Sequence, residues 1–156
     1  MKPYYRAGLL GLCLAAAGCG GPAVQPKTKE GATQIALSDV GELYRLYTAE
    51  KQKPPTKTDD FLPMERMNPT GVRAVETGDV IVRFGANLPD TGEEPGKGPG
   101  DEVLAYEKDV PTAGGHVMML NRTIRTMTPE EFRAAKLAGT ESSSDWTGGK
   151  AKGKRR

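Results

Sequence analysis

The stretch TQIALSDVGELYRLYTAEK, Thr33 to Lys51, carries the longest regular apolar pattern of the chain and decides the fold. Its apolar residues recur every three or four positions, which is the spacing of one face of an α-helix. They are Ala36, Leu37, Val40, Leu43, Tyr44 and Tyr47. Thr33 can cap the helix, and Pro54-Pro55 prevents its continuation. Because the polar face is acidic, we expect the apolar face to pack on a protein core rather than on lipid.

Short strand patterns follow this helix. Runs of β-branched and apolar residues, bounded by turn signals, predict antiparallel strands. The predicted strands are residues 72–75, 80–84, 102–107, 116–120 and 123–127. The first two would form a hairpin around the turn Glu76–Asp79. Further along the meander, Leu104 and Tyr106 would face Val117 and Met119.

Two short helices have start signals of their own. Thr58–Leu62 predicts a helical turn with its first residue as the cap. Thr128 and Glu131 form a capping box that starts a second helix, which Gly139 would end. Residues 85–100, rich in glycine and proline, predict a mobile loop.

These elements predict one α+β domain over residues 32–139. Its N-terminal amphipathic helix packs on a small antiparallel sheet of four to five strands, and a short C-terminal helix closes it. Residues 19–31 would be a flexible tether, and residues 140–156 a disordered basic tail. That tail is either simply solvated or attracted to an anionic surface.

An N-terminal export signal occupies residues 1–18. The apolar run Ala7–Ala17 follows positive charge and is shorter than the roughly 20 residues of a membrane-spanning helix. It ends in Ala16-Ala17-Gly18-Cys19, which resembles the bacterial lipobox. This resemblance to bacterial lipoproteins implies a thioether-linked diacylglyceride on Cys19, cleavage before it and acylation of the new amine.

Two alternatives to a lipoprotein are an ordinary signal peptide cut after Ala17 or Gly18, and an uncleaved anchor. Cys13 lies inside the segment to be removed, so Cys19 would be the only mature cysteine and no intramolecular disulfide could form. Gly20 stands where an Asp often signals inner-membrane retention, which favours the outer membrane. We therefore expect a lipid-anchored protein that faces the periplasm or the exterior.

Charge and composition bound the class of protein. The chain has 22 basic and 20 acidic residues, and removal of Lys2 and Arg6 with the signal leaves the two in balance. Neutrality argues against a general nucleic-acid binder. With 20 glycines, 12 prolines and only 6% aromatic residues, the chain suits a small core with long loops rather than a large enzyme.

His116 is the single histidine, and a hairpin would bring Glu107 or Asp109 near it. No serine or cysteine nucleophile accompanies it, so we predict no catalytic residue. The adjacent side chains of Asp59-Asp60 diverge, and no set of three ligands is apparent, so we predict no metal or other cofactor. His116 and Trp146 are the candidate contacts to a ligand or partner.

The segments Val103–Glu107, Gly114–Met119 and Thr128–Phe132, in this order, resemble the C-terminal end of type II secretion pseudopilins and prepilin-like proteins. Such proteins often have a hydrophobic strand, an Asp-Gly turn, another strand and a closing segment. Here Asn121-Arg122 takes the turn, and the lipobox stands in place of the apolar pilin anchor helix. The resemblance implies the fold but not filament assembly, because the filament is packed through that helix.

The sequence thus predicts a membrane-anchored, non-catalytic binding or scaffold module of the cell envelope, held by membrane lipid through acylated Cys19. The alternative is an accessory component of a type II secretion or pilus-like system, with envelope or secretion-system proteins as partners. A small hydrolase is the third hypothesis.

Overall fold

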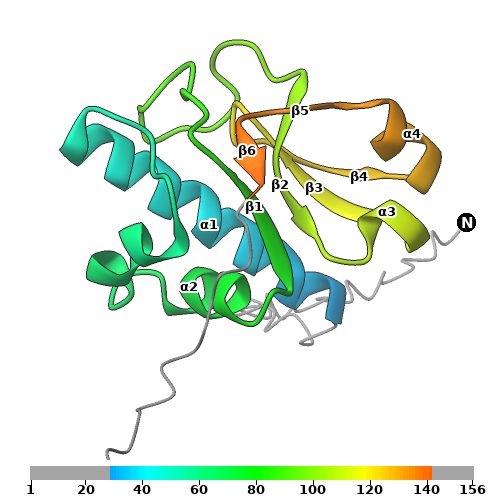
Figure 1. Ribbon diagram of the computed structural model, residues 1–156, viewed down its shortest axis with the longest axis horizontal. Coiled ribbons are helices and arrows are strands. Elements are labelled where there is room, and N and C mark those ends of the chain that lie inside the picture. Colours follow the sequence, from blue (N-terminus) through cyan, green and yellow to red (C-terminus); the bar gives the residue numbers. More distant parts are fainter. Residues whose placement is uncertain (1–28, 142–156) are drawn as a thin grey trace, which may run out of the picture.

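Helix α1, Lys29–Lys51, lies across one face of an antiparallel sheet (Figure 1). The computed structural model describes residues 29–141. After α1 come the 3-10 helix η1 (Thr58–Met64), α2 (Pro69–Glu76), β1 (Val80–Phe84), β2 (Glu102–Glu107), α3 (Val110–Ala113), β3 (Gly115–Met119), β4 (Ile124–Met127), α4 (Pro129–Ala134), β5 (Lys136–Leu137) and β6 (Thr140–Glu141). This mixture of helices with an antiparallel sheet confirms the predicted α+β class.

The sheet is built around β2. The strand order is β4-β3-β2-β1-β6 with antiparallel neighbours, and β5 pairs in parallel with the start of β2. Val80 pairs with Glu107, and Tyr106 pairs with Val117. The start of β1, the end of β2 and the start of β3 therefore lie at the same end of the sheet.

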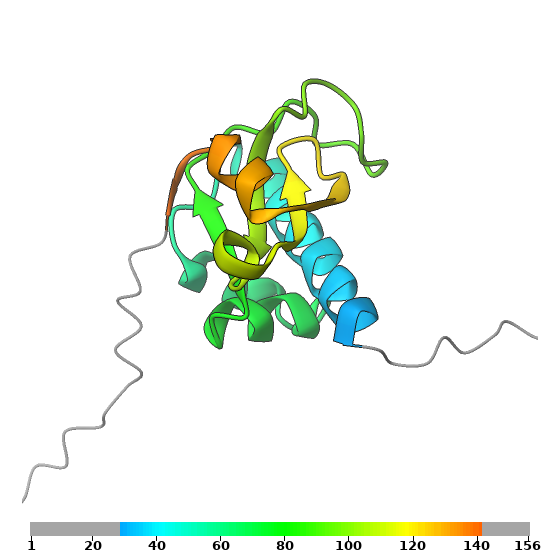
Figure 2. The ribbon, with the colours of Figure 1, turned by 90° about the vertical axis from the view of Figure 1, so that its right-hand side faces the viewer.

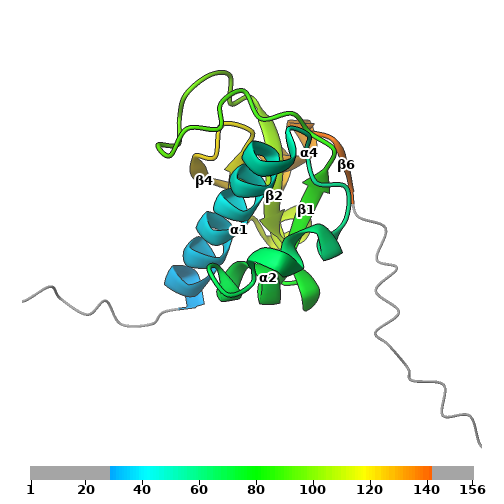
Figure 3. The same ribbon diagram turned by 90° about the vertical axis from the view of Figure 1, so that its left-hand side faces the viewer.

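Both faces of the sheet are covered by apolar packing. Leu37, Val40 and Leu43 of α1 are fully buried in a cluster that includes residues of η1, α2, β1 and β2. On the opposite face the rings of Tyr106 and Phe132 lie 4.7 Å apart. Figures 2 and 3 show α1 and α2 on one side of the sheet and α4 on the other.

The loop after β1, residues 85–100, is tied to the domain at several points. The Tyr44 hydroxyl accepts a hydrogen bond from Ala86 N–H at 2.8 Å and donates to the Ala86 carbonyl at 3.0 Å. Further along, Arg45 donates to the Thr91 carbonyl, and Gly96 N–H donates to the Asn121 carbonyl at 2.8 Å. The loop has no regular structure, as predicted, but these contacts hold it in place.

The predicted strand over residues 72–75 is wrong. These residues belong to α2, which has Pro69 in its first turn. A Cβ at Gly71 would lie 2.7 Å from the Cβ of Asp39, so α2 crosses α1 closely at this glycine. A short apolar run fits either a strand or a helix, and here the helix buries Val72 completely against α1. The hairpin partner of β1 is therefore β2.

Several helix boundaries also differ from prediction. α1 begins at Lys29, before the predicted cap Thr33. The hydrophobic periodicity could not reveal this first turn, because it contains no large apolar residue. η1 is capped by Lys57 rather than Thr58. α4 ends at Ala134 well before Gly139, because the next residues pair with β2 as β5.

Strand β2 contains an irregularity that the alternating pattern did not predict. Its register against β3 shifts between Val103 and Ala105, so Leu104 joins the α1 side of the core. Tyr106 and Met119 share the opposite face, as predicted. At the end of the domain, Thr140–Glu141, assigned to the tail from sequence, form β6.

None of the helices within residues 29–141 combines the length and apolar character required to cross a bilayer.

The Tyr44 hydroxyl should contribute strongly to stability. Tyr44→Phe leaves the buried N–H and carbonyl of Ala86 without their partner, which should lower the free energy of unfolding by about 1–3 kcal/mol in urea titrations. Tyr47→Phe, at a half-buried position of the same helix, is the control and should change it by less than about 0.5 kcal/mol.

The same variant has a second readout in alkaline solution. Burial raises the pKa of the Tyr44 hydroxyl, so only the unfolded chain ionises it near its ordinary pKa of about 10. Its contribution is fully present below pH ~10 and is lost as the pH rises further. Tyr44→Phe should flatten this loss, and an unchanged alkaline slope would contradict the assigned burial.

Candidate functional site

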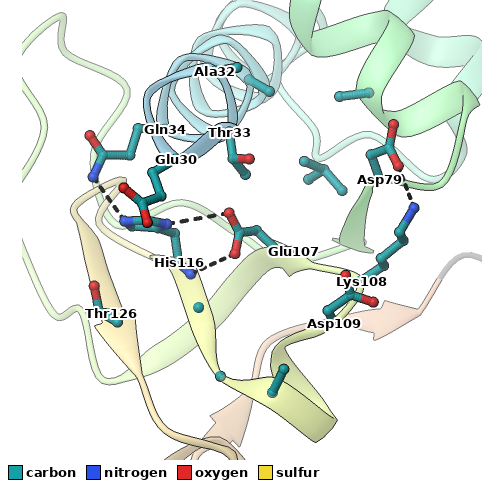
Figure 4. Close-up of a pocket in the computed structure, with 16 residues that line it drawn as sticks. Glu30, Ala32, Thr33, Gln34, Asp79, Glu107, Lys108, Asp109, His116 and Thr126 are labelled. Carbon is teal, nitrogen blue, oxygen red and sulfur yellow. Dashed lines mark hydrogen bonds and ion pairs between the residues drawn. The ribbon is translucent and has the colours of Figure 1, made fainter. Parts of the chain in front are cut away.

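A cleft of about 830 Å³ opens at the end of the sheet where β1 begins and β2 ends. The first turns of α1 form one wall, and the segment from the end of β2 through α3 to the start of β3 forms another (Figure 4). Residues from seven helices and strands line the cleft, namely α1, α2, β1, β2, α3, β3 and β4. The cleft therefore depends on the whole fold and not on one local motif.

Two glycines allow the chain to return close to the end of β2. Gly114 has φ +75° and ends α3, and Gly115 has φ +148° at the start of β3. A Cβ on Gly115 would lie 2.2 Å from Oε2 of Glu107. Glycine is favoured here because a φ of +148° strains residues with a side chain, and a Cβ would also displace the Glu107 carboxylate.

His116 is held on both ring nitrogens. Glu107 accepts from the His116 backbone N–H at 3.0 Å and lies 3.3 Å from Nδ1, while Gln34 Nε2 lies 2.9 Å from the ring Nε2. A carboxylate only accepts, so Nδ1 carries the proton, and Nε2 accepts from the Gln34 amide. The side chains of His116 and Glu107 are only 15% and 20% exposed. Figure 4 shows the three side chains in one row.

The remaining polar groups give the cleft an acidic character. Its lining contains the carboxylates of Glu30, Asp79, Glu107 and Asp109 and a single basic residue, Lys108. The Lys108 ammonium is paired with Asp79 at 2.6 Å, and Glu30, Asp79 and Asp109 are all exposed residues. The cleft therefore suits a cationic group better than an anionic one.

The geometry suits binding better than nucleophilic chemistry. A histidine general base needs a free Nε2 beside a nucleophile, but here the Gln34 amide is bonded to that nitrogen. The hydroxyls in the lining are those of Thr33 and Thr126, and no serine or cysteine lines this cleft. Between residues 29 and 141, no three metal-ligating side chains come together.

A smaller cavity of about 300 Å³ lies between α1 and the 85–100 loop. Arg122, only 9% exposed, donates from its guanidinium to the carbonyls of Gly92 and Glu94 in that loop. Arg45 hydrogen-bonds Glu42 and thereby holds the pKa of that carboxyl below its ordinary value. Burial and the nearby Arg45 lower the pKa of Arg122. These contacts hold the loop against the helix.

The candidate residues from sequence have different outcomes. The expected approach of Glu107 to His116 is confirmed, whereas the contribution of Gln34 carried no local signal, since it lies 82 residues away. Asp60, in the first turn of η1, accepts from the backbone N–H of Thr56 at 2.7 Å. Cys19 and Trp146 lie outside the described residues.

No protein-family model, curated protein or solved structure matches the chain.

The single histidine makes its proton position directly measurable. In the wild type, nitrogen NMR of the ring should show the proton on Nδ1, and Glu107→Gln should move it toward Nε2. The same variant should lose about 1.5–3 kcal/mol of stability, because two bonds to a charged acceptor are weakened.

Glu102→Gln, at the other end of β2, is the matched control and should leave both the tautomer and the stability nearly unchanged. A wild-type proton on Nε2 would contradict the arrangement of Glu107, His116 and Gln34.

Proposed function

We propose that this protein is a membrane-anchored, extracytoplasmic lipoprotein that acts as a non-catalytic binding module of the cell envelope. Its anchor is the acylated Cys19, implied by the lipobox Ala16-Ala17-Gly18-Cys19. Its working surface is the acidic cleft beside His116. Gly20 favours the outer membrane as its location.

One observation carries the proposal: the cleft is built from the first turns of the helix that follows the anchor. Glu30, Thr33 and Gln34 line it, and α1 begins only ten residues after Cys19. A chain of ten residues spans at most about 35 Å. The near wall of the cleft, at Glu30, would thus lie within about 39 Å of the lipid anchor.

The polar array supports binding in particular. Gln34, His116 and Glu107 satisfy one another, so they form a fixed surface rather than a reactive group. Ligand pockets are typically clefts of several hundred Å³ with a few fixed polar groups, and this cleft has that form.

Metabolic labelling with an acyl analogue tests the anchor. The wild type should be labelled and sediment with membranes, and Cys19→Ser should lose both properties, because the thioether needs the Cys19 sulfur. Cys13→Ser is the matched control, since Cys13 lies within the predicted signal and should not affect the label. Equal labelling of the wild type and Cys19→Ser would contradict the proposed lipid anchor.

The second candidate is an accessory role in a type II secretion or pilus-like system. It is supported by the packing of a long N-terminal helix on an antiparallel sheet, the arrangement that the pseudopilin resemblance implies. Here the lipid on Cys19 would replace the anchoring part of the pilin helix.

Cross-linking in intact cells followed by affinity purification separates the two candidates. The accessory role predicts recovery of secretion-system subunits with the full chain. It predicts none with residues 1–28 fused to an unrelated soluble domain, because the partner contacts would lie on residues 29–141. Equal recovery with both chains would show that the lipid anchor alone is responsible.

A further inference from the structure

We propose that the acidic cleft is a docking site for a basic peptide segment and that its occupant is Lys150–Arg156 of the same chain. This inference rests on the proposed binding function of the cleft and names its partner. The segment reads KAKGKRR and has five basic side chains and no acidic one. The cleft has four carboxylates and one lysine, which pairs with Asp79, one of the four. The two surfaces are therefore complementary in charge.

The direction of β6 brings the chain toward the cleft. Thr140 pairs with Phe84 and Glu141 with Arg83, so β6 runs antiparallel to β1 toward Val80 (Figure 1). Val80 itself lines the cleft. At Glu141 the chain is thus directed along β1 to the end of the sheet where the cleft opens.

Arg83 fixes this direction. Its guanidinium donates to the carbonyls of Ala138 and Gly139 at 2.9 and 3.1 Å and lies 3.4 Å from the Glu141 carboxylate. The backbone of the last described residues is thereby held against β1. The exit from the domain is defined by three contacts rather than left open.

The length of chain beyond β6 is sufficient. Three residues of β1 separate the position opposite Glu141 from Val80, which is about 10 Å along a strand. The eight residues 142–149 can span up to about 28 Å before the basic segment begins. The segment can therefore reach the end of the sheet where the cleft opens, and the exposed acidic residues there are Glu30, Asp79 and Asp109.

Because the basic segment and the cleft belong to one chain, even a weak contact between them can be populated. A single exposed ion pair improves affinity by less than about fivefold, so the free peptide should bind only weakly. A short linker raises the effective concentration to about the millimolar range, which favours occupancy within one chain. Because the groups are exposed, the contact should weaken as salt increases.

The experiment uses the lipidated chain in a neutral detergent and reads the tail and the cleft separately. Trp146 is the only tryptophan, so its quenching by acrylamide reports the tail, and the single His116 ring reports the cleft by NMR. Glu30→Gln with Asp109→Asn should raise Trp146 quenching at least about twofold, as should 0.5 M salt. Asp59→Asn with Glu65→Gln, two exposed acidic residues outside the cleft, should leave it unchanged.

The reciprocal variant changes the five basic residues of the tail to glutamine and should shift the His116 ring signals. Its control changes an equal number of exposed basic residues that do not line the cleft to glutamine, and should leave these signals in place. The control residues are Lys51, Lys53, Lys57, Arg66 and Lys97. Synthetic peptide 150–156 added to the tail variant should restore the wild-type signals.

Unchanged Trp146 quenching in the Glu30/Asp109 variant, together with unchanged His116 signals in the tail variant, would overturn the docking. Protection of Trp146 that depends on added anionic lipid and not on Glu30 and Asp109 would overturn it too, in favour of a lipid-bound tail. Neither the Trp146 quenching nor the His116 signals depend on the acyl labelling of Cys19. A failure of the lipid anchor and a failure of the docking therefore give different results. If added peptide shifts the His116 signals but the tail substitutions do not, the cleft binds basic peptides and the tail is not its occupant, which overturns the proposal.

Discussion

The rest of the structure depends on the burial of β2 on both faces. Val103, Leu104 and Ala105 are all fully buried, and Tyr106 is nearly so. A strand buried on both sides needs a layer of packing on each face of the sheet. Helix α1 supplies one layer, and α3 with α4 supplies the other. At Glu107, where β2 ends, residues of α1 and α3 line the cleft from the two layers. The cleft is thus a consequence of how the central strand is covered.

The sequence could predict the elements whose pattern is set by their own burial. The stripe of α1, the strands β1 to β4 and the capping box of Thr128 and Glu131 each follow from residues close together in the chain. Prediction failed where contacts between residues far apart in the chain decide the local structure. Residues 72–75 suit a strand, and only the close crossing at Gly71 shows why a helix forms. Leu104 changes face because β2 shifts register against β3, which no pattern within β2 records.

The same distinction between local and distant contacts applies to the residues of the site. His116 and Glu107 are nine residues apart, so a hairpin brings them together, and this much followed from the sequence. Gln34 is a polar residue near the start of a helix and carries no mark of its role until α1 is placed on the sheet. Arg122 was equally hidden, because a basic residue at a turn is ordinarily solvent-exposed. Its burial follows from the position of the 85–100 loop, which it contacts.

The turn at Arg122 shows how local strain and distant contacts are balanced. Arg122 has φ +65°, a conformation that glycine adopts freely and that costs a residue with a side chain about 1 kcal/mol or more. Glycine would remove this strain, but it would also remove the guanidinium that donates to the loop carbonyls. Because a hydrogen bond from a charged donor contributes about 1.5–3 kcal/mol, the arginine is the better residue at this position as long as the loop packs against it. The strained turn and the ordered loop therefore require each other, and a glycine at position 122 would leave this loop without its guanidinium contacts.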